Sequence, residues 1–299
     1  MSRIISLSSL AVVLGAGLAS SGQAATVYGL TTRDQLISFD SATPNMVASS
    51  WFIQGLAANE SLVGIDFRPA TGQLYGVGSF GRIYTINPSN GMATFQASLF
   101  NSANNQPLQL SGSEFGVDFN PVPDRLRVTS NLGQNLRINV ATGATILDGT
   151  LNQASGSPFI VASAYTNSFA GATSTTLYNI DSNSDMLTIQ TPPNNGTQVM
   201  VGALGMDVTA LAGMDILTMG STNTAYAALQ TAGTTGSKFA MINLATGTAT
   251  VIGNISMNQS SDSLAVRDIA VTAVPEPATM TALALGLAAM LRRRRRAAR

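Results

Sequence analysis

Short runs in which apolar and polar residues alternate fill the middle of the chain, and turn-forming residues separate them. Two stretches share one pattern: residues 64–91 read GIDFRPATGQLYGVGSFGRIYTINPSNG, and residues 116–143 read GVDFNPVPDRLRVTSNLGQNLRINVATG. They align without a gap at an offset of 52 residues and agree at nine positions. Alternation with a period of two predicts half-buried strands, and the glycine, proline and asparagine residues between them predict tight turns. Few runs in this region have a helical period.

One position of the second strand recurs along the chain and marks five units. The markers are Tyr28, Tyr75, Arg127, Tyr178 and Tyr226, at spacings of 47, 52, 51 and 48 residues. A period of about 50 residues made of strands and turns is typical of the blades of a β-propeller. The first unit lacks a first strand, whereas Ile269 to Thr272 at the far end form a first strand without a successor.

We therefore predict an all-β fold, a five-bladed propeller with four strands per blade. The C-terminal strand is expected to pair with the N-terminal blade, because such closure removes the exposed strand edges that promote aggregation. A β-sandwich or a six-bladed ring is the alternative arrangement.

The N-terminal segment has the pattern of a secretory signal peptide. Arg3 supplies the positive charge, residues 7–19 form an apolar run, and small residues lead up to Ala24, after which we predict cleavage. A membrane anchor is the alternative, but the run is short for a span of about 20 residues. The expected organisation is a signal peptide at residues 1–24, a propeller domain at residues 25–273 and a tail at residues 274–299.

The composition limits which catalytic and metal-binding groups the protein can have. The chain of 299 residues contains no cysteine and no histidine, which excludes disulfides, thiolate nucleophiles, Ser-His-Asp arrangements and the usual zinc ligands. Its formal net charge of zero is misleading, because seven of the 15 basic residues lie in the two terminal segments. The body between these segments has 8 basic and 14 acidic residues and hence a net charge of −6. A mildly acidic body argues against a nucleic-acid partner.

Three aspartates occupy equivalent positions in first strands, the strands that line the central channel in propellers. They are Asp66, Asp118 and Asp215. The other units have Ala164 and either Ala270 or, if the register shifts by two, Asp268. Several carboxylates around one channel are a candidate site for a cation or a polyhydroxyl ligand, and their proximity would raise pKa values. The alternative is that each carboxylate accepts backbone N–H groups of its own or the next blade and fixes blade packing.

A second candidate site is a polar turn between two later strands. Asp181, Asn183 and Asp185 have the alternating oxygen ligands of a calcium loop. Met186 stands where that loop needs glycine, and aspartate, asparagine and serine also form ordinary turns. No cofactor other than calcium is suggested by the sequence.

The tail combines three features in a fixed order. Pro275, Glu276 and Pro277 come first, an apolar run of 14 residues follows at positions 278–291, and a basic cluster comes next. The cluster consists of Arg292, Arg293, Arg294, Arg295 and Arg296. The apolar run is shorter than the roughly 20 residues of a lasting transmembrane helix, and the arginines would hold its end in the cytoplasm. An ordinary C-terminal anchor is the alternative.

This tail resembles the PEP-CTERM sorting signal of Gram-negative bacteria. The resemblance implies transient anchoring in the inner membrane by a transmembrane helix and recognition by an exosortase. It also implies cleavage near the Pro-Glu-Pro motif and release to the cell surface or extracellular matrix.

The body resembles a known family as well. The segments LVGIDFRPATGQLYGVG, FGVDFNPVPDRLRV, GQNLRIN, AYTNSFAGATSTTLYNID and PPNNGT are similar to an exported bacterial family classed as a domain of unknown function, number 4394. The similarity extends from Val27 nearly to Thr272. It agrees with the predicted fold and export, and it supplies no catalytic residues.

These patterns favour an exported, non-enzymatic propeller that binds polysaccharide or protein. Its expected partners are the Sec export machinery, the exosortase, exopolysaccharide and, before processing, the membrane through the tail. The alternative is a carboxylate- or calcium-dependent hydrolase or lyase acting on polysaccharide, since such chemistry needs no histidine.

Overall fold

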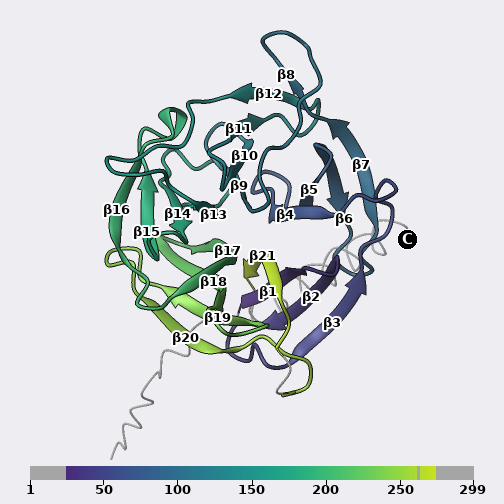
Figure 1. The fold of residues 1–299 in the computed structure, drawn as a ribbon. Coiled ribbons are helices and arrows are strands. Elements are labelled where there is room, and N and C mark those ends of the chain that lie inside the picture. The colour runs from purple at the N-terminus through teal and green to yellow at the C-terminus, as the bar shows by residue number, and fades with distance from the viewer. Residues whose placement is uncertain (1–24, 261–262, 274–299) are drawn as a thin grey trace, which may run out of the picture.

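The computed structural model describes residues 25–260 and 263–273, and in this part the protein is a ring of five small β-sheets (Figure 1). The predicted five-bladed propeller is confirmed. The helical content of these residues is one 3₁₀ turn, η1 (Pro193–Asn195), and none of their helices could cross a membrane. The predicted signal peptide, sorting motif, apolar run and arginine cluster lie outside the described residues.

Each blade is an antiparallel sheet whose first strand lines the centre of the ring and whose fourth strand lies at the rim. Blade 1 consists of β21 (Val266–Ala273), β1 (Ala25–Thr31), β2 (Gln35–Asp40) and β3 (Val47–Phe52). Blade 2 consists of β4 (Leu62–Phe67), β5 (Leu74–Gly78), β6 (Arg82–Ile86) and β7 (Ala93–Ser98). Blade 3 consists of β9 (Phe115–Asn120), β10 (Arg125–Ser130), β11 (Asn135–Ile138) and β12 (Ala144–Leu147), with the short β8 (Phe100–Asn101) added in parallel to β12. Blade 4 consists of β13 (Ile160–Tyr165), β14 (Leu177–Asp181), β15 (Met186–Gln190) and β16 (Gln198–Ala203). Blade 5 consists of β17 (Val208–Met219), β18 (Thr222–Thr231), β19 (Ser237–Ile242) and β20 (Ala249–Asn254).

The last strand closes the ring as the sequence predicts. β21 lies beside β1 (Figure 1) and pairs with it in antiparallel fashion, from Ala25 opposite Ala273 to Thr31 opposite Val266. The two ends of the propeller domain therefore share one sheet, and β21 covers the inner edge of β1, which would otherwise be unpaired.

The strand register agrees with the repeats in the sequence. Each second-strand marker lies directly opposite a residue of the first strand of its blade. The pairs are Tyr28 with Ala270, Tyr75 with Asp66, Arg127 with Asp118, Tyr178 with Ala164, and Tyr226 with Asp215. These five inner positions are therefore equivalent. Asp268 precedes Ala270 by two residues and lies in the next layer along the channel, on the same side of its strand.

Glycines in this next layer let the inner strands approach closely. A Cβ atom on Gly64 would lie 2.4 Å from a side-chain carbon of Val117, and one on Gly213 would lie 2.4 Å from the Cα atom of Asp268. Side-chain carbons do not normally come so close to other atoms, so a larger residue would push neighbouring blades apart. The close approach brings side chains of successive blades together at the centre.

Four of the five blade interfaces are apolar. One cluster of buried hydrophobic residues lies between blades 1 and 2, one between blades 2 and 3, one between blades 4 and 5, and one between blades 5 and 1. Aromatic pairs strengthen them, as where the ring centroids of Tyr75 and Phe119 lie 5.4 Å apart. Burial of these side chains supplies the main favourable term for ring formation.

The interface between blades 3 and 4 is polar instead. The buried Arg127 donates hydrogen bonds to Asp148 (2.6 Å), Asn135 (2.7 Å), Asn194 (3.0 Å) and the hydroxyl of Tyr165 (3.1 Å). A guanidinium this deeply buried needs an anionic partner, which Asp148 provides.

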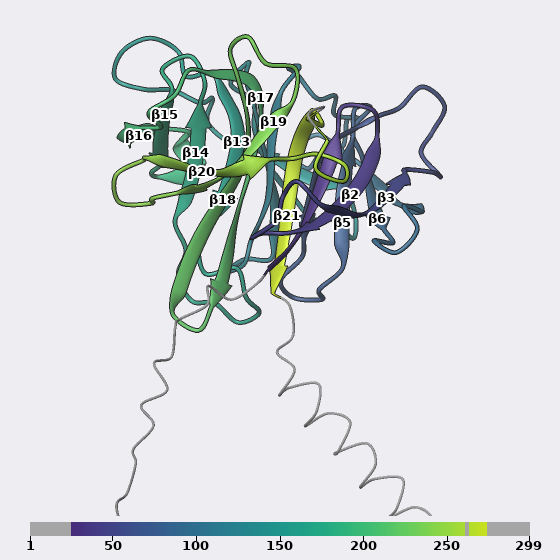
Figure 2. The same ribbon diagram turned by 90° about the horizontal axis from the view of Figure 1, so that it is seen from below.

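The ring has two faces, seen from the side in Figure 2. Ala25 and Ala273 pair at one end of blade 1, and we call this side of the ring the terminal face. The turn between β1 and β2 and the start of β21 lie at the other end, which we call the pocket face. The described chain therefore begins and ends on the same face.

Candidate functional site

The three predicted channel aspartates meet at the centre of the ring. Asp66 of β4, Asp118 of β9 and Asp215 of β17 each place a carboxylate oxygen within 4.8 Å of the others. All three are buried, with exposed fractions of 3%, 2% and 4%. Asp268 of β21 is also buried and interacts electrostatically with Asp66 and Asp118. We call the first three residues the central trio.

The four aspartates connect successive blades. Each carboxylate accepts a backbone N–H group from the inner strand of the next blade around the ring. The donors and acceptors are Phe119 to Asp66 (2.7 Å), Tyr165 to Asp118 (3.2 Å), Val271 to Asp215 (2.5 Å) and Ile65 to Asp268 (2.9 Å). Four of the five blade contacts are bridged in this way, and Ala164 occupies the equivalent position at the fifth. The bonds are those expected if the aspartates fix blade packing.

Burial changes the acidity of these groups. It is the largest cause that raises the pKa of Asp66 and of Asp118 well above their usual value, and it raises the pKa of Asp215 to about 6. Neighbouring carboxylates raise the pKa values of Asp66 and Asp118 further, whereas the backbone N–H groups lower all three. Desolvation therefore outweighs hydrogen bonding, and the centre of the ring takes up protons well above the usual range for aspartate.

The geometry limits what the trio can hold. Protons shared among the carboxylates would relieve the repulsion between like charges. A cation would do the same, but calcium takes about six to eight oxygen ligands, and both oxygens of Asp215 already accept backbone N–H groups. The burial of the trio leaves no access for a polysaccharide chain. Shared protons or one small cation are thus the occupants that the space favours.

The predicted calcium loop forms the turn between β14 and β15. Asp181 is fully buried and accepts the N–H groups of Phe159 and Asn183, both at 3.0 Å. Asp185 instead accepts the N–H group of Val208 at 2.8 Å. The two carboxylates hold different segments of backbone, as in an ordinary turn, and the calcium prediction gains no support from this geometry.

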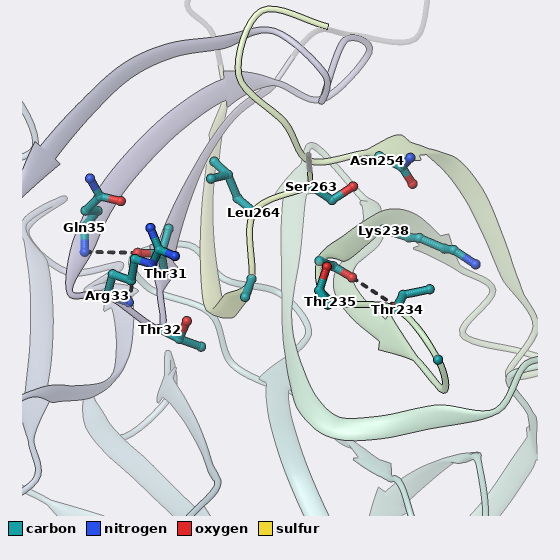
Figure 3. A pocket seen from close by; sticks show the side chains of 13 residues that line it. Thr31, Thr32, Arg33, Gln35, Thr234, Thr235, Lys238, Asn254, Ser263 and Leu264 are labelled. Atoms are coloured by element: carbon teal, nitrogen blue, oxygen red, sulfur yellow. Dashed lines mark hydrogen bonds between the residues drawn. The ribbon is translucent and has the colours of Figure 1, made fainter. Parts of the chain in front are cut away.

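A pocket that the sequence did not predict opens between blades 5 and 1 on the pocket face (Figure 3). Its volume is about 780 Å³. Residues from segments 31–35, 233–238 and 263–265 line it, together with Asn254. Blade 1 thus supplies one wall through its β1–β2 turn, and blade 5 supplies the other through β19 and the turn that precedes it.

Hydroxyl, amide and cationic groups dominate the walls of this pocket. Figure 3 shows Arg33 and Gln35 on one side and Lys238 and Asn254 on the other. The hydroxyl oxygen of Thr31 accepts hydrogen bonds from the N–H groups of Arg33 (3.3 Å) and Gln35 (3.1 Å), which fixes the turn that carries both side chains. No carboxylate belongs to the lining that the structure describes.

The pocket was missed because its parts are distant in the sequence. Segment 31–35 lies near the start of the domain and segments 233–238 and 263–265 near its end, so only closure of the ring makes them neighbours. One signal was available: Lys238 is the only lysine of the chain. A single ammonium group in a polar turn-and-strand region could have been selected as a candidate for ligand binding.

Comparison with known proteins identifies a family and a sorting motif. A family model described as a domain of unknown function (DUF4394) matches residues 35–270. A second model, described as a PEP-CTERM protein-sorting motif, matches residues 273–296. This motif is a signal recognised by exosortases and implies export with processing at the membrane. No curated protein matches the sequence.

A solved structure with a TM-score above 0.5 supports the fold and nothing further. A structural genomics protein of unknown function from Bacteroides thetaiotaomicron matches with a TM-score of 0.52 at 15% identity, over 84% of this chain and 65% of that one. The chain thus spans about two thirds of the length of that relative. A chain of a nidogen/laminin complex has a TM-score of 0.46 at 12% identity, with coverages of 83% and 98%. A glutaminyl cyclase from Myxococcus xanthus has a TM-score of 0.40 at 13% identity, with coverages of 66% and 77%.

Proposed function

Because the chain belongs to the family of the domain of unknown function DUF4394 and carries a PEP-CTERM sorting motif, we propose that it is an exported, non-enzymatic binding protein of a Gram-negative cell surface or extracellular matrix. Its ligand is a polysaccharide, which it binds in the pocket between blades 5 and 1. The Sec machinery exports the chain, and an exosortase processes it near Pro275, Glu276 and Pro277.

The chemistry of the pocket walls carries this proposal. A volume of about 780 Å³ is in the range of small-ligand pockets, which span about 300–1,000 Å³. The side chains of Thr32, Thr235 and Asn254 line it and form no hydrogen bonds within the described part of the protein. Hydroxyl and amide groups without internal partners suit a ligand that is itself rich in hydroxyl groups.

The position of the pocket fits a protein that is first held at a membrane. The tail follows Ala273 on the terminal face, whereas the pocket opens on the opposite face. A chain anchored by its tail would therefore present the pocket away from the bilayer, toward the polymers outside.

Binding to extracellular polysaccharides tests the proposal. We expect the full chain, expressed with its leader and tail and purified in a mild detergent, to be retarded in affinity electrophoresis by at least one polymer of a bacterial exopolysaccharide panel. Thr32→Trp should abolish this retardation, because the indole would fill the pocket. Ser221→Trp places the same side chain in the β17–β18 turn, which lies at the terminal face, and should have no effect. Retardation that survives Thr32→Trp would show that another surface binds the polymer.

A cation at the central trio is a second candidate function, favoured by the convergence of Asp66, Asp118 and Asp215. Such an ion would hold three blades together rather than act on a substrate. Elemental analysis of protein purified without chelators tests it, along with the shift of Tm on adding calcium. We expect any shift to be lost in Asp66→Asn and kept in Asp181→Asn. An unchanged Tm and no copurified metal would leave protons as the occupants of the trio.

A further inference from the structure

The basic residues of the body differ in whether they have partners. Four arginines form ion pairs with aspartate or glutamate; they are Arg68, Arg82, Arg127 and Arg137. Two further arginines, Arg125 and Arg267, donate hydrogen bonds to backbone carbonyl groups. Among the described residues, the side chains of Arg33 and Lys238 have neither kind of partner. Both of these residues line the pocket between blades 5 and 1.

This coincidence is informative because the body as a whole is acidic. The body has 14 acidic residues, and six of its eight basic side chains have partners among the described residues. The two that have none in this described part share one pocket. They come from different blades and lie on opposite walls of the pocket (Figure 3). No carboxylate of the described lining neutralises them. Two like charges in one pocket repel each other, and an anionic ligand would remove that repulsion.

We infer that the ligand of this pocket is an acidic saccharide whose carboxylate groups bind to Arg33 and Lys238. The inference rests on the proposed function and specifies the charge of the polysaccharide. The planar guanidinium of Arg33 suits a carboxylate through two parallel hydrogen bonds, whereas the ammonium of Lys238 acts as a compact point charge. Gln35 and Asn254 stand beside them and supply amide groups for the sugar hydroxyls.

Matched polymers separate the role of charge from that of sugar. Oligomers of polygalacturonate, alginate and hyaluronate are titrated into the full chain in mild detergent, and so are the same oligomers after reduction of their carboxyl groups to alcohols. We expect at least one acidic oligomer to bind, and its reduced form to bind at least about tenfold more weakly. Added salt should weaken the binding of the acidic oligomer. Poly-glutamate serves as an acidic polymer that lacks sugar.

Two variants test the residues themselves. Lys238→Gln and Arg33→Gln should each reduce the affinity for the acidic oligomer about tenfold. Arg125→Gln is the matched control, since Arg125 lies at the other end of its blade, near the terminal face, and should leave the affinity unchanged. Equal Tm values for the three variants would show that folding is not the cause.

The single lysine gives an independent readout. An acetylating reagent should modify Lys238, and the acidic oligomer should slow that modification, measured by mass spectrometry of the one lysine-containing peptide. No effect of either variant and no protection of Lys238 would overturn the assignment of the pocket.

The remaining outcomes distinguish this inference from the proposed function. Equal affinity for acidic and reduced oligomers would overturn the inference and leave polysaccharide binding intact. Equal affinity for poly-glutamate would show a site for acidic chains in general and would also overturn it. Binding of no oligomer in the acidic or the reduced set would count against the proposed function itself.

Discussion

Each aspartate of the central trio is subject to opposing effects. Backbone N–H groups favour the ionised carboxylate, whereas burial and the neighbouring carboxylates favour the protonated form of Asp66 and Asp118. Burial is the largest of these effects, so the pKa values rise. Contacts between blades therefore depend on pH through groups that lie far from the surface.

This acidity predicts a pH-dependent stability. Between the usual pKa of 3.8 and the raised value, the folded state binds more protons than the unfolded state, so the free energy of unfolding falls as pH rises through that window. For Asp215 this pH window ends at about 6. The contribution of this one group to the free energy of unfolding at low pH is on the order of 3 kcal/mol. We expect Tm to fall between about pH 4 and pH 7. Asp124, whose pKa is lowered by Arg68, acts in the opposite direction.

Two substitutions of Asp66 separate charge from hydrogen bonding. Asp66→Asn keeps an acceptor for the N–H group of Phe119 and removes one titrating group, so it should flatten the dependence of Tm on pH. Asp66→Ala leaves that N–H group without an acceptor and should cost about 1–3 kcal/mol at every pH. Calorimetry across the pH range compares the two. Identical profiles for Asp66→Asn and the wild type would refute the assigned acidity.

Substitution of Arg127 should strongly lower the stability of the protein, although arginine is a residue type that usually lies at the surface. Arg127→Ala would leave Asp148 with Arg137 as its remaining ion-pair partner and would open the polar interface between blades 3 and 4. We expect it to lower the free energy of unfolding by about 3 kcal/mol in urea titrations. Arg125→Ala, two residues earlier on the same strand, should change it by less than about 0.5 kcal/mol.

Among the elements, β21 holds a position that no other strand can fill. Ending the chain after Ala265 would leave β1 as an unpaired inner edge and would remove the acceptor that Asp268 offers to Ile65. We expect this truncation to yield aggregated protein. Ending the chain after Ala273 keeps all described strands and should preserve Tm. Size-exclusion chromatography and calorimetry of the two truncations measure the difference, and soluble monomer from the shorter one would contradict the closure.

The strands that follow the sequence repeat could be predicted, whereas the strands that depart from it could not. The repeat at an offset of 52 residues gave the correct register for β4, β5, β9 and β10, because period-two alternation directly reflects strand pairing. It could not give the two-residue β8 or the length of β17, since neither follows the repeat. Arg127 stood out as the one marker that is not tyrosine, but only the assembled ring shows that its interface is polar.

For the whole molecule, the proposed anchoring through the tail predicts that the two faces of the ring differ in their access to reagents. We expect Lys238, on the pocket face, to react with a membrane-impermeant amine reagent on spheroplasts while the tail still anchors the protein. In the variant Ser221→Lys, the new lysine in the β17–β18 turn on the terminal face should react more slowly in the anchored form, because the proposed anchoring would put the bilayer beside it. Both lysines should react at similar rates once the tail is removed. Equal rates in the anchored form would show that the ring does not stand on its terminal face.

The same long-range arrangement limited what the sequence could predict about the sites. Equivalent positions in repeats identified the central trio, because equivalent residues meet at the axis of a ring. The pocket joins the first blade to the last, and no local pattern relates Arg33 to Lys238. A site of this kind becomes visible only after the order of the blades is known.

The position of Ala273 has a mechanical consequence. β21 runs along the axis of the ring (Figure 2) and continues directly into the tail, so tension on a tether would pull this strand lengthwise. A lengthwise pull loads all seven residue pairs of the ladder with β1 together rather than one after another. A flowing medium that drags on the anchored ring would thus load β21 along the direction in which its ladder with β1 best resists force. Cleavage of the tether would then release the propeller with its ring still closed.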